Sequence, residues 1–175
     1  MKISDFILKE KTRGDCYRFL SACFYQPQKE LFLQEKLFEN LTAALKEICP
    51  DAVISSDRMK SAVLNCSDEE LSVEYARLFM GPFELVAPPY GSVYLDGARQ
   101  VMGDSTVETM KMYEAAGLSM DNEFKELPDH ITVELEFMNF LIYKEIEAIE
   151  KSDFSTALNL IKVQELFLDK FLKRW

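Results

Sequence analysis

The stretch Ile131–Glu150 reads ITVELEFMNFLIYKEIEAIE. Its apolar residues recur mostly at steps of three and four, which is the spacing of one face of an α-helix. This apolar set comprises Ile131, Leu135, Met138, Leu141, Ile142, Ile146 and Ile149. The glutamates fall largely off that face (Glu134, Glu136, Glu147 and Glu150). The pattern predicts a long helix, restarting at Pro128, with one stripe buried in a core.

Outside this stretch, similar spacings predict further helices. Their ranges are 5–25, 30–48, 51–64, 67–80, 104–116 and 153–173. Ser67 followed by Glu70 matches the capping box that starts a helix. The last helix is expected to bury Phe154, Leu158, Ile161, Leu168 and Leu172. No segment alternates like a strand, so the predicted fold is all-α, a single-domain helical bundle over residues 1–175.

Residues 81–97 interrupt the helical pattern with three of the six prolines and three of the six glycines. A long loop in a compact domain is usually functional or disordered, and this one is too apolar for disorder. Pro88 and Pro89 favour extended backbone, which would present a set of apolar side chains rigidly. That set is Phe83, Leu85, Val86, Tyr90, Val93 and Tyr94. Two readings stay open: a hydrophobic cover over the helices, or a recognition surface.

The composition limits the classes of partner. The formal net charge is −10, so the electrostatic field of the chain repels nucleic-acid phosphates and anionic lipid. The same charge would attract a basic polypeptide, although it also serves ordinary solubility. No stretch has the length of a membrane span, and the N-terminus lacks an export signal. We therefore expect a cytoplasmic protein with no stable membrane insertion.

Catalytic and metal-binding patterns are missing from the sequence. The four cysteines form no CxxC pair, and His130 is the single histidine. Motifs for serine hydrolases, zinc proteases, P-loops and dinucleotide binding do not occur. The chain is therefore not expected to be an enzyme or to hold a metal or organic cofactor. Asp129, next to His130 at a predicted helix start, is interpreted first as a helix cap.

Three segments together resemble one known family. They are Glu74–Pro82 (EYARLFMGP), Pro88–Tyr94 (PPYGSVY), and Leu127–His130 (LPDH) followed by Glu134–Met138 (ELEFM). In order and spacing they are similar to the signatures of the TorD/DmsD/NarJ-like redox enzyme maturation chaperones. Tyr90 stands where some members carry tryptophan, so the resemblance leaves the subfamily and the client open.

The resemblance implies a chaperone that binds the twin-arginine leader and the apo catalytic subunit of a molybdopterin oxidoreductase. It would assist cofactor insertion and proofreading before export. The family's groove maps onto Leu78, Phe79, Pro88, Pro89, Tyr90, Asp129 and His130 here, and we expect the apolar side chains of Val86 and Tyr94 to join them in binding the peptide. We expect the apolar side chains to take the leader's apolar region, and carboxylates including Asp129 to read its paired arginines.

Two other functions are weighed against this one. The first is a small helical enzyme or nucleotide hydrolase that uses Asp129 and His130 as acid and base. The second is a dimeric helical adaptor without leader binding, which would dimerise by exchanging helices about residues 81–103. The chaperone hypothesis requires that two separated segments meet, so it predicts that Tyr90 and His130 lie together.

Overall fold

The computed structural model describes residues 2–81, 86–97, 101–120 and 125–174. Within these ranges the protein is helical, and its only β-type pairing is one isolated bridge. This confirms the predicted all-α class. The chain divides into two compact units, Met1–Pro88 and Pro89–Trp175. None of the helices in the described part is both long and apolar enough to cross a membrane.

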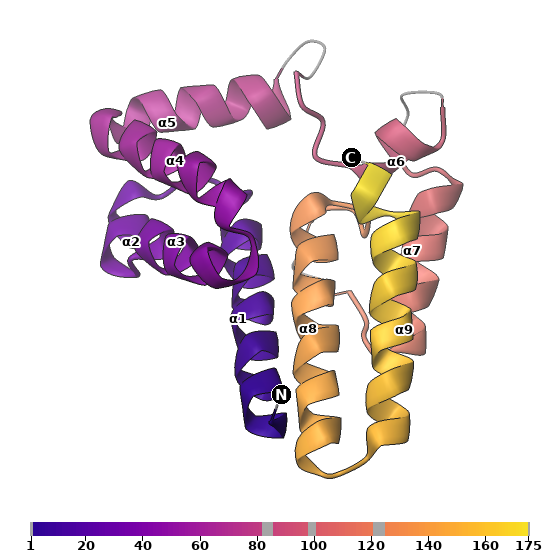
Figure 1. Ribbon diagram of the computed structural model, residues 1–175. Coiled ribbons are helices and arrows are strands. Elements are labelled where there is room, and N and C mark those ends of the chain that lie inside the picture. The colour runs from indigo at the N-terminus through magenta and orange to yellow at the C-terminus, as the bar shows by residue number, and fades with distance from the viewer. Residues whose placement is uncertain (1, 82–85, 98–100, 121–124, 175) are drawn as a thin grey trace. The chain divides into compact units, whose positions relative to one another are not determined.

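The first unit holds α1 (Ile3–Ala22), α2 (Lys29–Gln34), α3 (Leu37–Ile48), α4 (Val53–Asn65) and α5 (Asp68–Tyr75) (Figure 1). A 3-10 turn, Pro50–Ala52, precedes α4, and a π-helical turn, Ala76–Met80, follows α5. Helix α3 packs against both α1 and α4. Its apolar face supplies most of the buried residues of two small cores. Leu41, Ala44 and Leu45 join Cys16 of α1 in one core, and Leu37 and Phe38 join Val63 of α4 in the other.

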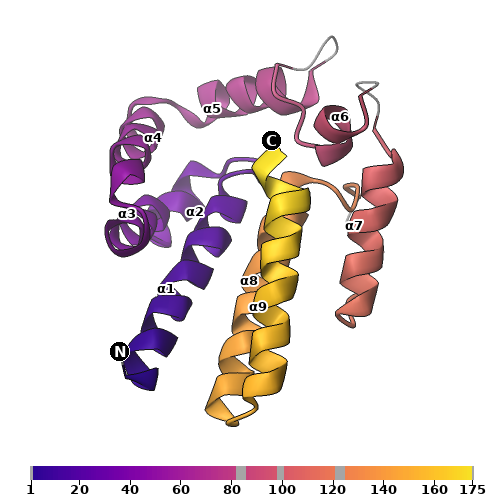
Figure 2. The ribbon, with the colours of Figure 1, turned by 45° about the vertical axis from the view of Figure 1, so that its right-hand side comes forward.

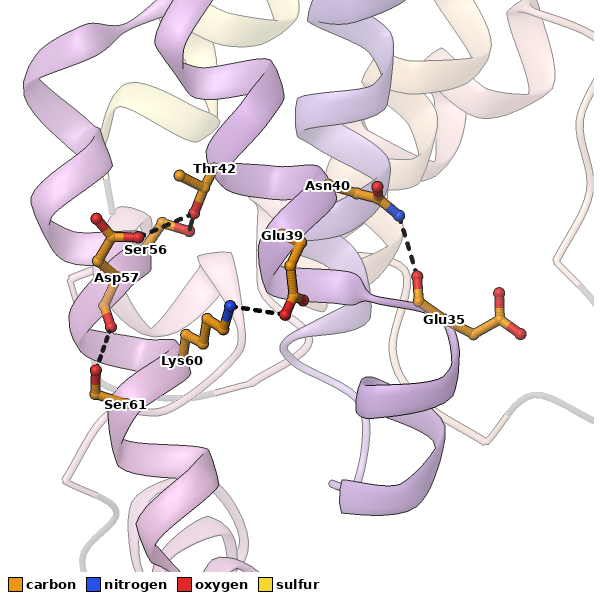
Figure 3. Close-up of polar contacts among 8 residues, drawn as sticks. All are labelled: Glu35, Glu39, Asn40, Thr42, Ser56, Asp57, Lys60 and Ser61. Carbon is orange, nitrogen blue, oxygen red and sulfur yellow. Dashed lines mark hydrogen bonds and ion pairs between the residues drawn. The ribbon is translucent and has the colours of Figure 1, made fainter.

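Polar contacts reinforce the packing of α3 on α4 (Figure 3). The hydroxyls of Thr42 and Ser56 are hydrogen-bonded at 2.8 Å, and both residues are buried. Nearer the surface, Lys60 pairs with Glu39 at 2.7 Å. Burying a polar group costs free energy unless the group is hydrogen-bonded. The hydroxyl pair therefore favours the relative position of the two helices in which Thr42 and Ser56 meet.

The second unit holds α6 (Gly91–Leu95), α7 (Asp104–Ala115), α8 (Ile131–Glu150) and α9 (Phe154–Lys170), and ends in the 3-10 turn η3 (Leu172–Arg174). Helices α8 and α9 form an antiparallel hairpin (Figure 1). All seven residues of the predicted α8 stripe are buried, which confirms that prediction. Aromatic rings complete the core, with Phe167 packed on Phe137 and Phe171 at centroid distances of 4.9 and 5.0 Å.

The capping box of Ser67 and Glu70 is confirmed, but several predicted boundaries were wrong. The helix predicted over 30–48 is broken, because Lys36 has a left-handed φ of 50°. The break turns Phe32 onto Phe38, at 5.8 Å between ring centroids. Helix α8 begins at Ile131 rather than at Pro128.

The segment predicted to be irregular also needs correction. Gly91–Leu95 forms the short helix α6, whose Ser92 amide donates to the distant carboxylate of Asp129. Phe83 and Leu85 lie outside the described residues, as does part of the hinge predicted over 81–103.

The predicted buried stripe of the last helix was wrong for its first half. Phe154, Leu158 and Ile161 are exposed, whereas Ala157, Gln164 and Phe167 are buried. The buried face therefore includes a polar residue, Gln164, whose amide donates to Glu145 on α8 at 2.8 Å. Glu134 and Glu145 are themselves fully buried on α8, although the predicted stripe left glutamates outside the core. The spacing of apolar residues alone cannot predict that polar residues lie on the buried face of a helix.

Candidate functional site

Two segments that lie about forty residues apart in the sequence meet in the second unit. The amide of Gly91 donates to the carbonyl of Asp129, and the amide of Ile131 donates to the carbonyl of Pro89, both at 2.9 Å. These bonds form an isolated antiparallel bridge between Tyr90 and His130. The backbone at Tyr90 is extended, as antiparallel pairing requires. The predicted meeting of Tyr90 and His130 is confirmed.

The side chains of the two bridged residues are also in contact. The rings of Tyr90 and His130 meet edge to face, with 5.4 Å between centroids. The Tyr90 hydroxyl donates to the carboxylate of Glu126 at 2.7 Å. Tyr90 is partly exposed and Glu126 is exposed, whereas His130 is only 4% exposed. The surface at this point therefore consists of an aromatic ring beside a carboxylate, with the imidazole beneath.

Asp129 has a different place from the one predicted. Its side chain is 0% exposed, and its Oδ2 accepts a hydrogen bond from the amide of Ser92 at 2.8 Å. It therefore caps the start of α6. The prediction that Asp129 caps the following helix was wrong, because the N-cap of α8 is His130, whose Nδ1 accepts from the amide of Thr132 at 3.2 Å.

These two hydrogen bonds weaken the enzyme hypothesis. A general acid or base must be able to reach a proton of the substrate, but Asp129 is 0% and His130 only 4% exposed. In addition, the carboxylate bonds to a backbone amide and the Nδ1 of the ring caps a helix. Within the described ranges, no three His, Cys, Asp or Glu side chains are grouped so that they could hold a metal ion.

The imidazole of His130 is held neutral by its surroundings. Burial lowers its pKa below 6.5, and the nearby carboxylates of Glu126, Asp129 and Glu136 oppose part of that shift. The hydrogen bond from Thr132 also requires an unprotonated Nδ1. The unfolded chain therefore takes up a proton at a higher pH than the folded chain does, so protonation favours unfolding.

Because the folded pKa is depressed, the contribution of His130 to stability is present above about pH 6.5 and is lost as pH falls toward the folded pKa. We expect the free energy of unfolding of the native protein to fall faster than that of a His130→Asn variant between pH 7.5 and 5. Asparagine is a good N-cap that does not titrate in this range. Urea titrations at a series of pH values measure this difference, and parallel curves would contradict it.

A second carboxylate, that of Asp96, links the end of α6 to the start of α7. Asp96, which follows α6, accepts hydrogen bonds from the amide and the hydroxyl of Ser105, at 3.2 and 2.8 Å for its Oδ2. A Cβ added at Gly103 would lie 1.9 Å from the same oxygen, so a side chain at this position would displace the Asp96 carboxylate. Helix α6 is thus fixed at both ends, by Asp129 and by Asp96, and it carries Tyr94 at the surface with 44% exposure.

The other predicted site residues lie in the first unit. Phe79 packs edge to face on Tyr75 and Phe24, with ring centroids 5.1 and 5.8 Å away. The carbonyl of Leu78 accepts from the amide of Ala87 at 3.0 Å, and Val86 is exposed. The structure therefore groups Pro89, Tyr90, Tyr94, Asp129 and His130 in the second unit, and Leu78, Phe79, Val86 and Pro88 in the first.

Three residues of the site in the second unit were not predicted from the sequence. Glu126 and Ser92 gave no signal, because their partners are distant in the sequence. Tyr113 is buried on α7 and donates its hydroxyl to the carbonyl of Pro128 at 2.9 Å, which fixes the turn before His130. Burial, and then the charges of Glu134 and Asp129, raise the Tyr113 pKa, so the hydroxyl remains a donor. An aromatic residue in a helical pattern could have indicated burial but not this bond.

Comparison with known proteins identifies relatives of the chain. A family model described as the nitrate reductase delta subunit matches residues 33–175. Among individual proteins, a chaperone protein TorD from Aliivibrio salmonicida is 29% identical over 171 residues, covering 93% of this chain and 78% of that protein. The TorD protein of Photobacterium profundum is 33% identical, with 61% of this chain and 48% of that protein covered.

Shorter matches and a solved structure agree with this assignment. A Tat proofreading chaperone DmsD from Salmonella typhimurium is 38% identical over 64 residues, which cover 37% of this chain and 31% of the relative. The matches to the Photobacterium and Salmonella proteins thus span about half of those proteins or less. A crystal structure assigned as a redox enzyme maturation protein from Archaeoglobus fulgidus superposes with a TM-score of 0.52 at 21% identity.

That superposition covers 87% of this chain and 92% of the Archaeoglobus chain, and it supports the fold alone. The named TorD and DmsD relatives are chaperones, in agreement with the prediction that this chain is not an enzyme. Since the family model covers most of the chain, the protein belongs to the nitrate reductase delta subunit family, which includes the TorD and DmsD redox enzyme maturation chaperones.

Proposed function

We propose that this protein is a cytoplasmic chaperone that binds the twin-arginine leader and the apo form of a molybdopterin oxidoreductase. It would hold the precursor while the cofactor is inserted, and release it for export. The observation that carries the proposal is the bridge that joins Tyr90 to His130 beside Glu126, in a chain whose relatives are named TorD and Tat proofreading chaperone DmsD.

The chemistry of this surface suits a leader with paired arginines and an apolar region. Glu126 and Glu136 are both exposed, and both lie close enough to His130 to act on its charge. A guanidinium forms its strongest hydrogen bonds with carboxylates, so these two residues are the proposed arginine ligands. Asp129 is fully buried and keeps α6 in place, which makes it a positioning residue rather than a contact.

The apolar part of the leader would lie on Tyr90 and Tyr94, because aromatic side chains bury a large area with little loss of conformational entropy. Leu78, Phe79, Val86 and Pro88 of the first unit stay predicted contacts. Apolar burial would supply most of the affinity, and the carboxylates would supply orientation and a faster association.

A binding experiment tests the arginine ligands. The probe is a synthetic leader with two adjacent arginines followed by an apolar segment of about 12 residues, measured by fluorescence anisotropy. We expect a Glu126→Gln and Glu136→Gln double variant to weaken binding by about 10- to 100-fold, since each lost charged hydrogen bond costs about 1 kcal/mol or more.

The matched control removes two exposed charges on the hairpin of α8 and α9. Glu150 and Glu165 are exposed, and Glu150 lies at the opposite end of α8 from Glu136, about 20 Å along the helix. A Glu150→Gln and Glu165→Gln variant should bind nearly as well as the native protein. A leader with lysines in place of the arginines should bind weakly to all three proteins. Equal affinities across the variants and leaders would contradict the proposal.

A further inference from the structure

The hydroxyl of Tyr90 has a role that its aromatic ring does not explain. It donates a hydrogen bond to Oε2 of Glu126, and the 2.7 Å between the two oxygens is the usual distance for such a bond. The two residues lie 36 positions apart in the sequence, so the bond exists only because the fold brings their segments together. It joins an aromatic residue of the proposed site to a proposed arginine ligand.

Tyr90 provides a fixed position for this hydroxyl. The bridge that its neighbours form with the segment before α8 has two backbone hydrogen bonds, both at 2.9 Å. Its ring packs edge to face on the buried His130, with 5.4 Å between centroids. Figure 2 shows α6 and the start of α8 at the same end of the second unit. Backbone and ring are therefore both held, and the hydroxyl is held with them.

Glu126 differs from Tyr90 in its surroundings. It is exposed and lies outside the helices, in the turn that leads to α8. A glutamate side chain that is free to move loses much conformational entropy when a ligand orders it. The hydrogen bond from Tyr90 restricts Glu126 before any ligand arrives, so less of this entropy remains to be lost on binding.

The restricted carboxylate can still accept hydrogen bonds. An ionised carboxylate has about four lone-pair sites on two oxygens, and the Tyr90 hydroxyl uses one of them, on Oε2. Enough acceptor sites remain for the two parallel N–H groups of a guanidinium. Lysine presents a compact charge on a flexible stem, which gains less than a planar guanidinium from an acceptor of fixed orientation.

We propose that the Tyr90 hydroxyl is a positioning group that orients the Glu126 carboxylate and thereby makes the leader site select arginine over lysine. This inference rests on the proposed function and deepens it, because it names a residue that determines specificity for the paired arginines. Tyr90 acts here through Glu126, in addition to the apolar contact made by its ring.

The test uses Tyr90→Phe, which keeps the ring and removes only the hydroxyl. The probes are the twin-arginine leader and the same leader with two lysines, both followed by fluorescence anisotropy. We expect the variant to bind the arginine leader about 3- to 10-fold more weakly than the native protein, because Glu126 must then be ordered on binding. Its affinity for the lysine leader should change by less than about twofold, so the preference for arginine falls.

A double-mutant cycle shows whether the hydroxyl acts through Glu126. In a Glu126→Gln background, Tyr90→Phe should have no further effect on the affinity for the arginine leader. Stopped-flow kinetics give an independent measure. Because Tyr90→Phe removes no charge, the salt dependence of association should remain that of the native protein, and the loss should appear as faster dissociation.

Tyr143→Phe is the matched control. Tyr143 is 57% exposed on α8, and its hydroxyl also lies beside a glutamate, Glu147. It lies about 18 Å along the helix from Ile131, and therefore far from the Tyr90 bridge. The control should bind both leaders like the native protein, and thermal unfolding should show that both tyrosine variants are folded.

Three results with Tyr90→Phe would overturn the inference. An equal loss for both leaders would assign the effect to the shape of the site, and tighter binding of the arginine leader would show that the hydroxyl competes with arginine for Glu126. Unchanged binding would show that the hydroxyl has no role. The proposed function survives all three if the native protein prefers the arginine leader, whereas a native protein that binds neither leader would contradict the proposed function itself.

Discussion

Replacing Phe167 with alanine is expected to lower the free energy of unfolding by about 3–5 kcal/mol, the usual cost of removing a buried phenylalanine. Phe167 is 0% exposed and lies at the centre of the second unit's core. Its ring contacts those of Phe137, Phe171 and Tyr113, the last at 6.2 Å between centroids. The substitution removes a ring from a close-packed cluster that can only partly collapse, so the transfer and cavity costs add.

Phe154 provides the matched control on the same helix. It is exposed at the first turn of α9, so Phe154→Ala should change the free energy of unfolding by less than about 1 kcal/mol. Urea titrations followed by circular dichroism measure both variants. If the two substitutions cost the same, α9 does not have the orientation described.

Phe154 and Phe167 also show where the apolar pattern failed to predict which residues of α9 are buried. Phe154 was predicted to be buried, and Phe167 was not among the predicted buried residues. Several apolar residues lie off the buried face of α9, while Gln164 lies on it because Glu145 accepts its amide. Helix α8 could be predicted because the apolar residues of its buried face follow the helical spacing, although Glu134 and Glu145 are buried with them. The rotation of α9 depends on a polar partner on another helix, which the sequence of α9 does not contain.

The site could be predicted in outline for a similar reason. Pro88 and Pro89 indicated extended backbone, and the resemblance indicated that this segment meets Asp129 and His130. The role of each residue in the site depends on contacts with residues that are distant in the sequence. One example is the hydrogen bond from Ser92 to Asp129, which lie 37 residues apart. A carboxylate before a helix reads as the cap of that helix. Here His130 supplies that cap, and Asp129 is turned inward to α6.

Asp129→Ala is expected to lower the free energy of unfolding by about 2–3 kcal/mol and to weaken leader binding as well. The substitution leaves the amide of Ser92 without its acceptor in a site that is closed to water, since Ser92 and Asp129 are both 0% exposed. Helix α6 has five residues and too few internal bonds to persist without its cap. Tyr94 would then lose its fixed position, and the leader would meet a disordered surface.

Asp129→Asn separates positioning from direct recognition. The asparagine side-chain oxygen can still accept from Ser92, so this variant should lose only about 1 kcal/mol of stability and bind the leader almost normally. Stopped-flow association measured over a range of salt concentrations reports the charges that the leader meets. If Asp129 only positions α6, the asparagine variant keeps the salt dependence of the native protein, whereas the Glu126/Glu136 variant loses much of it. A reduced salt dependence in Asp129→Asn would instead place its charge at the arginines, and would require α6 to open when the leader binds.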